Sequence, residues 1–122
     1  MIIIMGVALI LGLGLGFALD ITYPTEYSFY ITMGLLAAMD SVVGAIRSTL
    51  EDKYDATIFV SGFATNAILA GALTFMGDKL GVPLYYAAIL VFGGRLFNNL
   101  AAIRRILIEK YRNKKNQKLV GK

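Results

Sequence analysis

"AILVFGGRLFNNLAAIRR", residues 88–105, begins as an apolar run and then places a permanent charge, Arg95, behind two glycines. Asn98 and Asn99 follow Arg95 within about one helical turn. A lone charge at the centre of a membrane helix costs roughly 2.5–3.5 kcal/mol. If this stretch crosses a membrane, the rest of the chain must therefore supply Arg95 with a partner.

The composition favours a membrane protein over a soluble domain. The chain has 122 residues, of which 57% are hydrophobic and only 16% are charged. A soluble domain this short has a large surface relative to its core, so it needs more polar residues than these to cover it. We therefore expect a protein of the cell membrane that crosses the bilayer several times.

The absence of two residue types limits the chemistry. The sequence contains no cysteine and no histidine, which removes disulfides, thiol nucleophiles, the usual zinc sites and histidine acid–base catalysis. An aspartyl mechanism needs two carboxylates, and only Asp40 lies in an apolar stretch. We expect no enzyme activity, no metal and no cofactor.

Four apolar stretches set the expected architecture. About 20 apolar residues cross a hydrocarbon layer of about 30 Å as a helix. The sequence predicts an all-α, four-helix transmembrane bundle over residues 1–103, with helices at about 1–19, 28–47, 58–76 and 84–103.

The first stretch has a competing interpretation as a cleaved signal peptide. It has no basic residue at its start, and Phe17-Ala18-Leu19 is a poor cleavage site, so we favour a retained helix. Gly12 and Gly16 have the GxxxG spacing of helix–helix contacts, or they simply reflect the composition of membrane helices.

The basic charge is concentrated at the C-terminus. Residues 104–122 contain eight basic residues and one acid, whereas residues 1–103 contain four basic and seven acidic residues. Basic segments stay in the cytoplasm, so four crossings place both termini on the cytoplasmic side. We expect 104–122 to be a basic cytoplasmic tail that is helical at its start.

The tail has two interpretations that are compatible with each other. It anchors the last helix at the membrane surface, and it offers contacts for anionic lipid headgroups or an acidic partner. Nucleic-acid binding is not expected of a tail held at a membrane. The residues expected to make these contacts are Arg104, Arg105, Lys110, Arg112, Lys114 and Lys115.

Three polar residues on different helices are predicted to lie at similar depths. Asp40 lies slightly to the cytoplasmic side of the centre of its stretch, while Asn66 and Arg95 lie close to the centres of theirs. The three depths agree within about one helical turn, or roughly 5 Å. Because arginine stays charged and presents a planar set of donors, we predict that Arg95 pairs with the Asp40 carboxylate.

Helical spacing extends this group to other polar residues that lie beside small ones, as expected of packed membrane helices. One interpretation is a set of polar contacts that fix helix register and rotation, which we favour. The other is a proton or ion path that uses Asp40. The predicted intramembrane polar cluster consists of Asp40, Arg47, Asn66, Arg95, Asn98 and Asn99.

The sequence resembles the small basic protein family of bacterial membrane proteins. The resemblance is carried by "LLAAMDSVVGAIRS" (35–48), by "VSGFATNAILAGALTFMGDKLGVPLYYAAILVFGGRLFNNLAAIRR" (60–105) and by the glycine-rich apolar start. It implies a multi-pass inner-membrane protein of the kind often encoded beside cell-division and envelope genes. It implies no catalytic or ligand-binding residues.

These observations predict a small interaction or scaffold subunit for the division or envelope machinery. The bundle is small and its faces are rich in glycine and alanine, so we expect that one copy does not bury all of its polar faces. This predicts a homo-oligomer, with another membrane protein as a further partner. The alternative is a channel or transporter subunit in which Asp40, Asn66 and Arg95 line a polar path.

Overall fold

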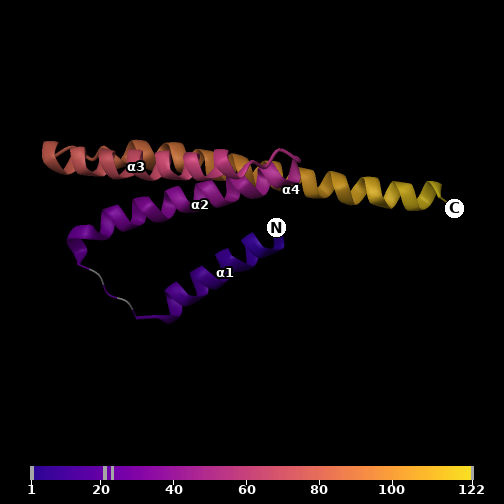
Figure 1. The fold of residues 1–122 in the computed structure, drawn as a ribbon, viewed down its shortest axis with the longest axis horizontal. Helices are drawn as coiled ribbons and strands as arrows, with labels where there is room; N and C mark the ends of the chain where they lie inside the picture. The colour runs from indigo at the N-terminus through magenta and orange to yellow at the C-terminus, as the bar shows by residue number, and fades with distance from the viewer. Residues whose placement is uncertain (1, 21, 23, 122) are drawn as a thin grey trace.

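The computed structural model describes residues 2–20, 22 and 24–121, and all of its regular elements are helical in these residues. The helices are α1 (Ile2–Ala18), α2 (Ser28–Leu50), α3 (Ala56–Leu80) and α4 (Tyr85–Val120) (Figure 1). A short 3-10 helix, η1 (Thr25–Tyr27), precedes α2. The expected all-α fold of four helices is confirmed.

Three of the four helices are long and apolar enough to cross a membrane: Thr25–Leu50, Ala56–Leu80 and Tyr85–Val120. Helix α1 is also apolar but has only 17 residues. At 1.5 Å per residue it is about 25 Å long, slightly less than the hydrocarbon layer of about 30 Å.

Helix α2 is the centre of the bundle. It packs along both α3 and α4, whereas α3 and α4 make few contacts with each other and α1 contacts only α2. Figure 1 shows α1 diverging from the other three helices. An apolar cavity of about 550 Å³ separates α1 from α2, and it is lined by residues such as Met5, Leu9, Met39 and Val42.

One half of the bundle, next to the α3–α4 turn, has an apolar core. Small alanines on all three long helices let the backbones approach closely, as expected of membrane helices. The larger Met33 and Phe92 fill the space between them. The buried core residues are Met33, Ala37, Ala70, Ala88 and Phe92.

The α3–α4 turn depends on two glycines. Gly81 ends α3 in the left-handed region (φ 69°), where glycine carries no steric penalty. Gly77 lies against the returning chain, and a Cβ atom at this position would be 2.5 Å from the Val82 carbonyl oxygen and 3.1 Å from the Leu84 nitrogen. The turn therefore has no room for a side chain at residue 77.

The α2–α3 link is held by a capping carboxylate. Asp55 accepts hydrogen bonds from the backbone nitrogens of Thr57 (2.8 Å) and Ile58 (3.1 Å), which satisfies two of the free donors at the start of α3. Lys110 on α4 donates from Nζ to the Leu50 carbonyl oxygen at 3.4 Å. The α2–α3 link and the basic part of α4 therefore lie on the same side of the bundle.

Helix α4 does not end where the apolar sequence ends. It continues through the basic segment to Val120 and projects beyond the other helices (Figure 1). The segment is rich in lysine and arginine, both good helix formers, and it contains no glycine or proline before Gly121. Its 36 residues make a helix of about 54 Å.

We predict that Gly77→Ala lowers the free energy of unfolding by about 1–3 kcal/mol, because the new methyl group meets backbone atoms that cannot move away. Gly71→Ala in the same helix is the control, since a Cβ there would meet nothing within 4 Å. Unfolding in detergent, followed by circular dichroism, measures both. Equal stability of the two variants would contradict the packing described for the turn.

Candidate functional site

The carboxylate of Asp40 is completely buried at the contact of α2, α3 and α4. Arg95 Nη2 on α4 lies 3.3 Å from Asp40 Oδ2, so the ion pair predicted from the sequence is present. Asn66 Nδ2 on α3 lies 3.5 Å from the same oxygen, which makes its hydrogen bond a long one. The three residues at matching predicted depths thus meet at one atom.

The two partners of the ion pair differ in their surroundings. The Asp40 side chain has an exposed fraction of zero, whereas that of Arg95 is 52%. The second carboxylate oxygen, Asp40 Oδ1, and the neighbouring Ser41 Oγ are buried and have no hydrogen-bond partner among the described residues. Arg95 alone therefore does not complete the hydrogen bonding of this site.

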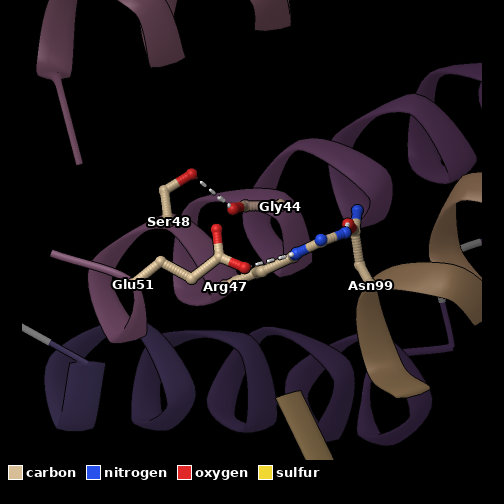
Figure 2. A network of polar contacts seen from close by, with 5 residues as sticks. All are labelled: Gly44, Arg47, Ser48, Glu51 and Asn99. Atoms are coloured by element: carbon tan, nitrogen blue, oxygen red, sulfur yellow. Dashed lines mark hydrogen bonds and ion pairs between the residues drawn. The ribbon is translucent and has the colours of Figure 1, made fainter. Parts of the chain in front are cut away.

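A second polar group lies closer to the α2–α3 link. Arg47 donates from Nε to Glu51 Oε1 and from Nη1 to Asn99 Oδ1, both at 3.1 Å, and so joins α2 to α4 (Figure 2). Ser48 Oγ donates to the Gly44 carbonyl oxygen at 2.9 Å. A Cβ on Gly44 would be 3.6 Å from Asn99 Nδ2, an ordinary van der Waals distance, so this position of the groove has room for a small side chain.

Glu51 belongs to this group although the sequence interpretation did not include it. It lies four residues after Arg47, on the same face of a helix, and this spacing was the available signal. Both side chains are about one-third exposed. The pair therefore contributes only a few tenths of a kcal/mol to stability, and its main effect is to orient Arg47 toward Asn99.

The two polar groups line one continuous groove of about 380 Å³ between α3 and α4. Its floor is the face of α2 that carries Asp40, Ser41, Gly44 and Ser48. The α3 wall is mostly apolar, with Ile58, Phe59 and Phe63 beside the polar Asn66, and the other wall is formed by Arg95 and Asn99 of α4. The charged residues at its outer end are Arg47, Glu51, Lys53 and Asp55.

The groove is polar at one end of the bundle only. Asp40 lies eleven residues before Glu51, which corresponds to about 16 Å along α2. Past Asp40, toward the α3–α4 turn, the apolar core begins with Ala37 and Ala70. The polar lining thus reaches about halfway through a hydrocarbon layer of about 30 Å and stops.

Other residues of the predicted cluster and tail lie away from this groove. Asn98 is exposed on α4, next to Asn99 but on the outer surface of the helix. The basic residues of the tail are exposed on the C-terminal half of α4, and in the described part of the chain they form no ion pair. They are Arg104, Arg105, Lys110, Arg112, Lys114 and Lys115.

The acidic residues do not form a metal site. No group of three or more acidic side chains that could hold a metal ion occurs within residues 2–20, 22 and 24–121. Arg95 next to Asp40 also disfavours a cation at that carboxylate. The groove instead offers both hydrogen-bond donors and acceptors.

Comparison with known proteins places the chain in a family. A family model described as "Protein of unknown function (DUF1290)" matches residues 23–108. The chain belongs to this family.

Curated relatives agree with this assignment. The chain is 50% identical over 113 residues to the "Small basic protein" of Bacillus subtilis (strain 168), covering 92% of this chain and 93% of that relative. It is 38% identical over 102 residues to an uncharacterized protein of Mycobacterium bovis, covering 82% and 84% of the two chains. The resemblance seen in the sequence is confirmed. No solved structure matches the chain.

We predict that Arg95→Ala lowers the free energy of unfolding by on the order of 3 kcal/mol, because it leaves the buried Asp40 carboxylate without its cation. The double variant Asp40→Ala/Arg95→Ala should lose less than the two single variants together, with a coupling above about 0.5 kcal/mol. Unfolding of all three variants in detergent measures the cycle. Additive losses would mean that the pair does not form in the membrane protein.

Proposed function

We propose that this protein is a small interaction subunit of the cell membrane that works as a homo-oligomer, with both termini in the cytoplasm. The observation that carries the proposal is the outer surface of α4, where Asn98 is exposed within an apolar helix. An amide facing lipid has no hydrogen-bond partner, whereas a neighbouring helix can supply one.

The surroundings of Asn98 support a helix–helix contact. We define the α4 stripe as the exposed residues that repeat at steps of four and three along one side of α4. Three residues of the stripe, Ala87, Gly94 and Ala101, are small, and small residues let membrane helices approach closely. The stripe consists of Ala87, Val91, Gly94, Asn98, Ala101 and Arg105.

A second copy of the chain suits this stripe. The four–three spacing is typical of two helices that pack as a left-handed pair. Identical chains inserted in one membrane have the same orientation, so their α4 helices can pack in parallel. An asparagine side chain has both a donor and an acceptor, so two Asn98 amides can bond across a twofold axis. A single asparagine at such a position is a known way to fix register and partner number.

The projecting part of α4 supports a role in contacting other molecules. A helix of about 54 Å extends about 24 Å beyond a hydrocarbon layer of about 30 Å. We propose that Arg104 and Arg105 contact anionic headgroups at the surface, and that the more distant basic residues contact an acidic partner.

The place of this subunit in the cell is proposed from the family resemblance. Proteins of this kind are often encoded beside division and envelope genes, so we propose a scaffold role in that machinery. No catalysis is assigned to the chain, since it lacks histidine and cysteine and buries a single carboxylate.

The alternative is a channel or transporter subunit. That role requires a polar path across the whole membrane, whereas the polar lining of the groove ends at Asp40, and Ala37 and Phe92 belong to the core beyond it. We therefore favour the interaction role.

We predict that Asn98→Leu weakens the homo-oligomer by about 1 kcal/mol, or roughly fivefold in its dissociation constant, because one pair of interhelical hydrogen bonds is lost. Phe97→Leu is the control, since Phe97 is exposed and lies outside the stripe. Particle mass in nanodiscs over a range of protein-to-lipid ratios measures the change. A particle that stays monomeric at the highest ratio would exclude the oligomer.

A second prediction concerns the role in the cell. If the subunit acts through the α4 stripe, replacing the chromosomal gene by Asn98→Leu should reproduce the change in septum placement or envelope integrity caused by deleting the gene. Phe97→Leu should leave the cells normal. A deletion strain with unchanged division and envelope would argue against this cellular role, whatever the oligomeric state.

A further inference from the structure

We propose that the groove between α3 and α4 is a water-filled vestibule, open on the side of the α2–α3 link and closed at the Asp40–Arg95 ion pair. The ligand that it takes is water, together with small hydrogen-bonding solutes that fit the same space. The inference goes beyond the proposed function, because it rests on the inside of one chain and needs no second copy.

The first observation is the unsatisfied hydrogen bonding at the deep end. Asp40 Oδ1 and Ser41 Oγ are buried, and no partner for either lies among the described residues. A buried polar atom without a hydrogen bond costs about 1–3 kcal/mol, so such atoms almost always have a partner. Both residues line the groove, and a small displacement of the side chains that cover these atoms would let a water molecule reach them.

The second observation is the surplus of donors on the other side of the same pair. The guanidinium group of Arg95 has five N–H donors and lies near Asp40 through one nitrogen, Nη2. About half of its side chain is exposed, and it lines the groove. Water in the groove accepts hydrogen bonds from the exposed part of Arg95, whereas Asp40 lies directly behind the guanidinium and is covered.

The third observation is that the groove has both the space and the polarity that water requires. A water molecule occupies about 30 Å³ and needs two to four polar partners, so 380 Å³ holds about ten. The outer end carries the charged side chains of Arg47, Glu51, Lys53 and Asp55, which keep the opening hydrated. From there to Asp40 the floor presents Ser48, Gly44 and Ser41 rather than large apolar side chains.

The closed end follows from the apolar core. Ala37 and Ala70 are each 1% exposed and Phe92 is 5% exposed, so the next layer of the bundle is tightly packed. Space of this kind has no polar partner for water and stays dry. The aqueous phase therefore reaches the Arg95 side of the ion pair from one side of the membrane and goes no further.

This arrangement explains how a permanent charge is kept at the centre of the last apolar helix. Arg95 is neutralised by Asp40 and hydrated through the vestibule. The free-energy cost of placing its charge within the membrane is therefore well below that of a lone charge in hydrocarbon. Because Lys110 ties the basic part of α4 to the end of α2, the vestibule opens on the same side as the basic segment.

The natural absence of cysteine makes a direct test simple. Single cysteines are placed at the mouth (Ser48→Cys) and deeper in the groove (Gly44→Cys), where a Cβ meets only Asn99 Nδ2, at 3.6 Å. A membrane-impermeant methanethiosulfonate is added to each side of proteoliposomes in turn. Ser61→Cys is the matched control, since Ser61 is exposed on α3, within a helix apolar enough to cross a membrane, but lies outside the groove. Ala70→Cys tests the closed end.

We expect both groove cysteines to react from one side, at least about tenfold faster than Ser61→Cys, because the reactive thiolate forms in water and is suppressed in apolar surroundings. Ala70→Cys should not react from either side. Thermal unfolding checks that each variant folds before it is labelled.

Two results would overturn the proposal. If the deep cysteine reacts as slowly as Ser61→Cys, the groove is dry or filled by another protein segment. If Ala70→Cys reacts, the water path continues past Asp40 and the vestibule is not closed. Neither result depends on whether Asn98 holds two copies together, so the vestibule and the homo-oligomer are tested separately.

Discussion

The rest of the structure depends on the complete burial of one carboxylate within a bundle of apolar helices. Asp40 has no exposed surface, and an isolated charge in such a place would be very costly. The fold meets this requirement by bringing Arg95 from α4 and Asn66 from α3 to the same carboxylate oxygen. Three helices must therefore hold a common depth and rotation, which fixes how they pack.

This requirement divides the bundle into two unlike halves. Next to the α3–α4 turn, alanines and two large apolar side chains form a dense core, and Gly77 lets the chain reverse without a gap. On the other side of Asp40, α3 and α4 separate and leave the polar groove above α2. Packing in the apolar half offsets the cost of burying Asp40 Oδ1 and Ser41 Oγ, which have no hydrogen-bond partner among the described residues.

Helix α4 connects the features to which we assign a role. Along one helix it carries the cation of the buried pair, the exposed stripe around Asn98 and the basic segment that projects from the bundle. Because the helix is continuous, a contact made by the basic segment acts on the same rigid element that holds Arg95. Helix α1, which contacts only α2, is the part of the chain with the fewest internal constraints.

The sequence by itself determined the all-helical fold, because long apolar stretches leave few other ways to satisfy the backbone in a membrane. It also determined the Asp40–Arg95 pair, since depth along a helix can be counted in residues and a buried charge needs an opposite one. Tertiary structure decided which polar residues share the groove, because this depends on how each helix is rotated and where α3 and α4 part. That rotation placed Asn98 outside and left Asp40 Oδ1 buried without a partner among the described residues, and no local pattern encodes it. Glu51 did have a local signal, its position four residues after Arg47. The helical continuation of the basic segment to Val120 had a local signal in its good helix formers, but only the structure shows it projecting free of the bundle.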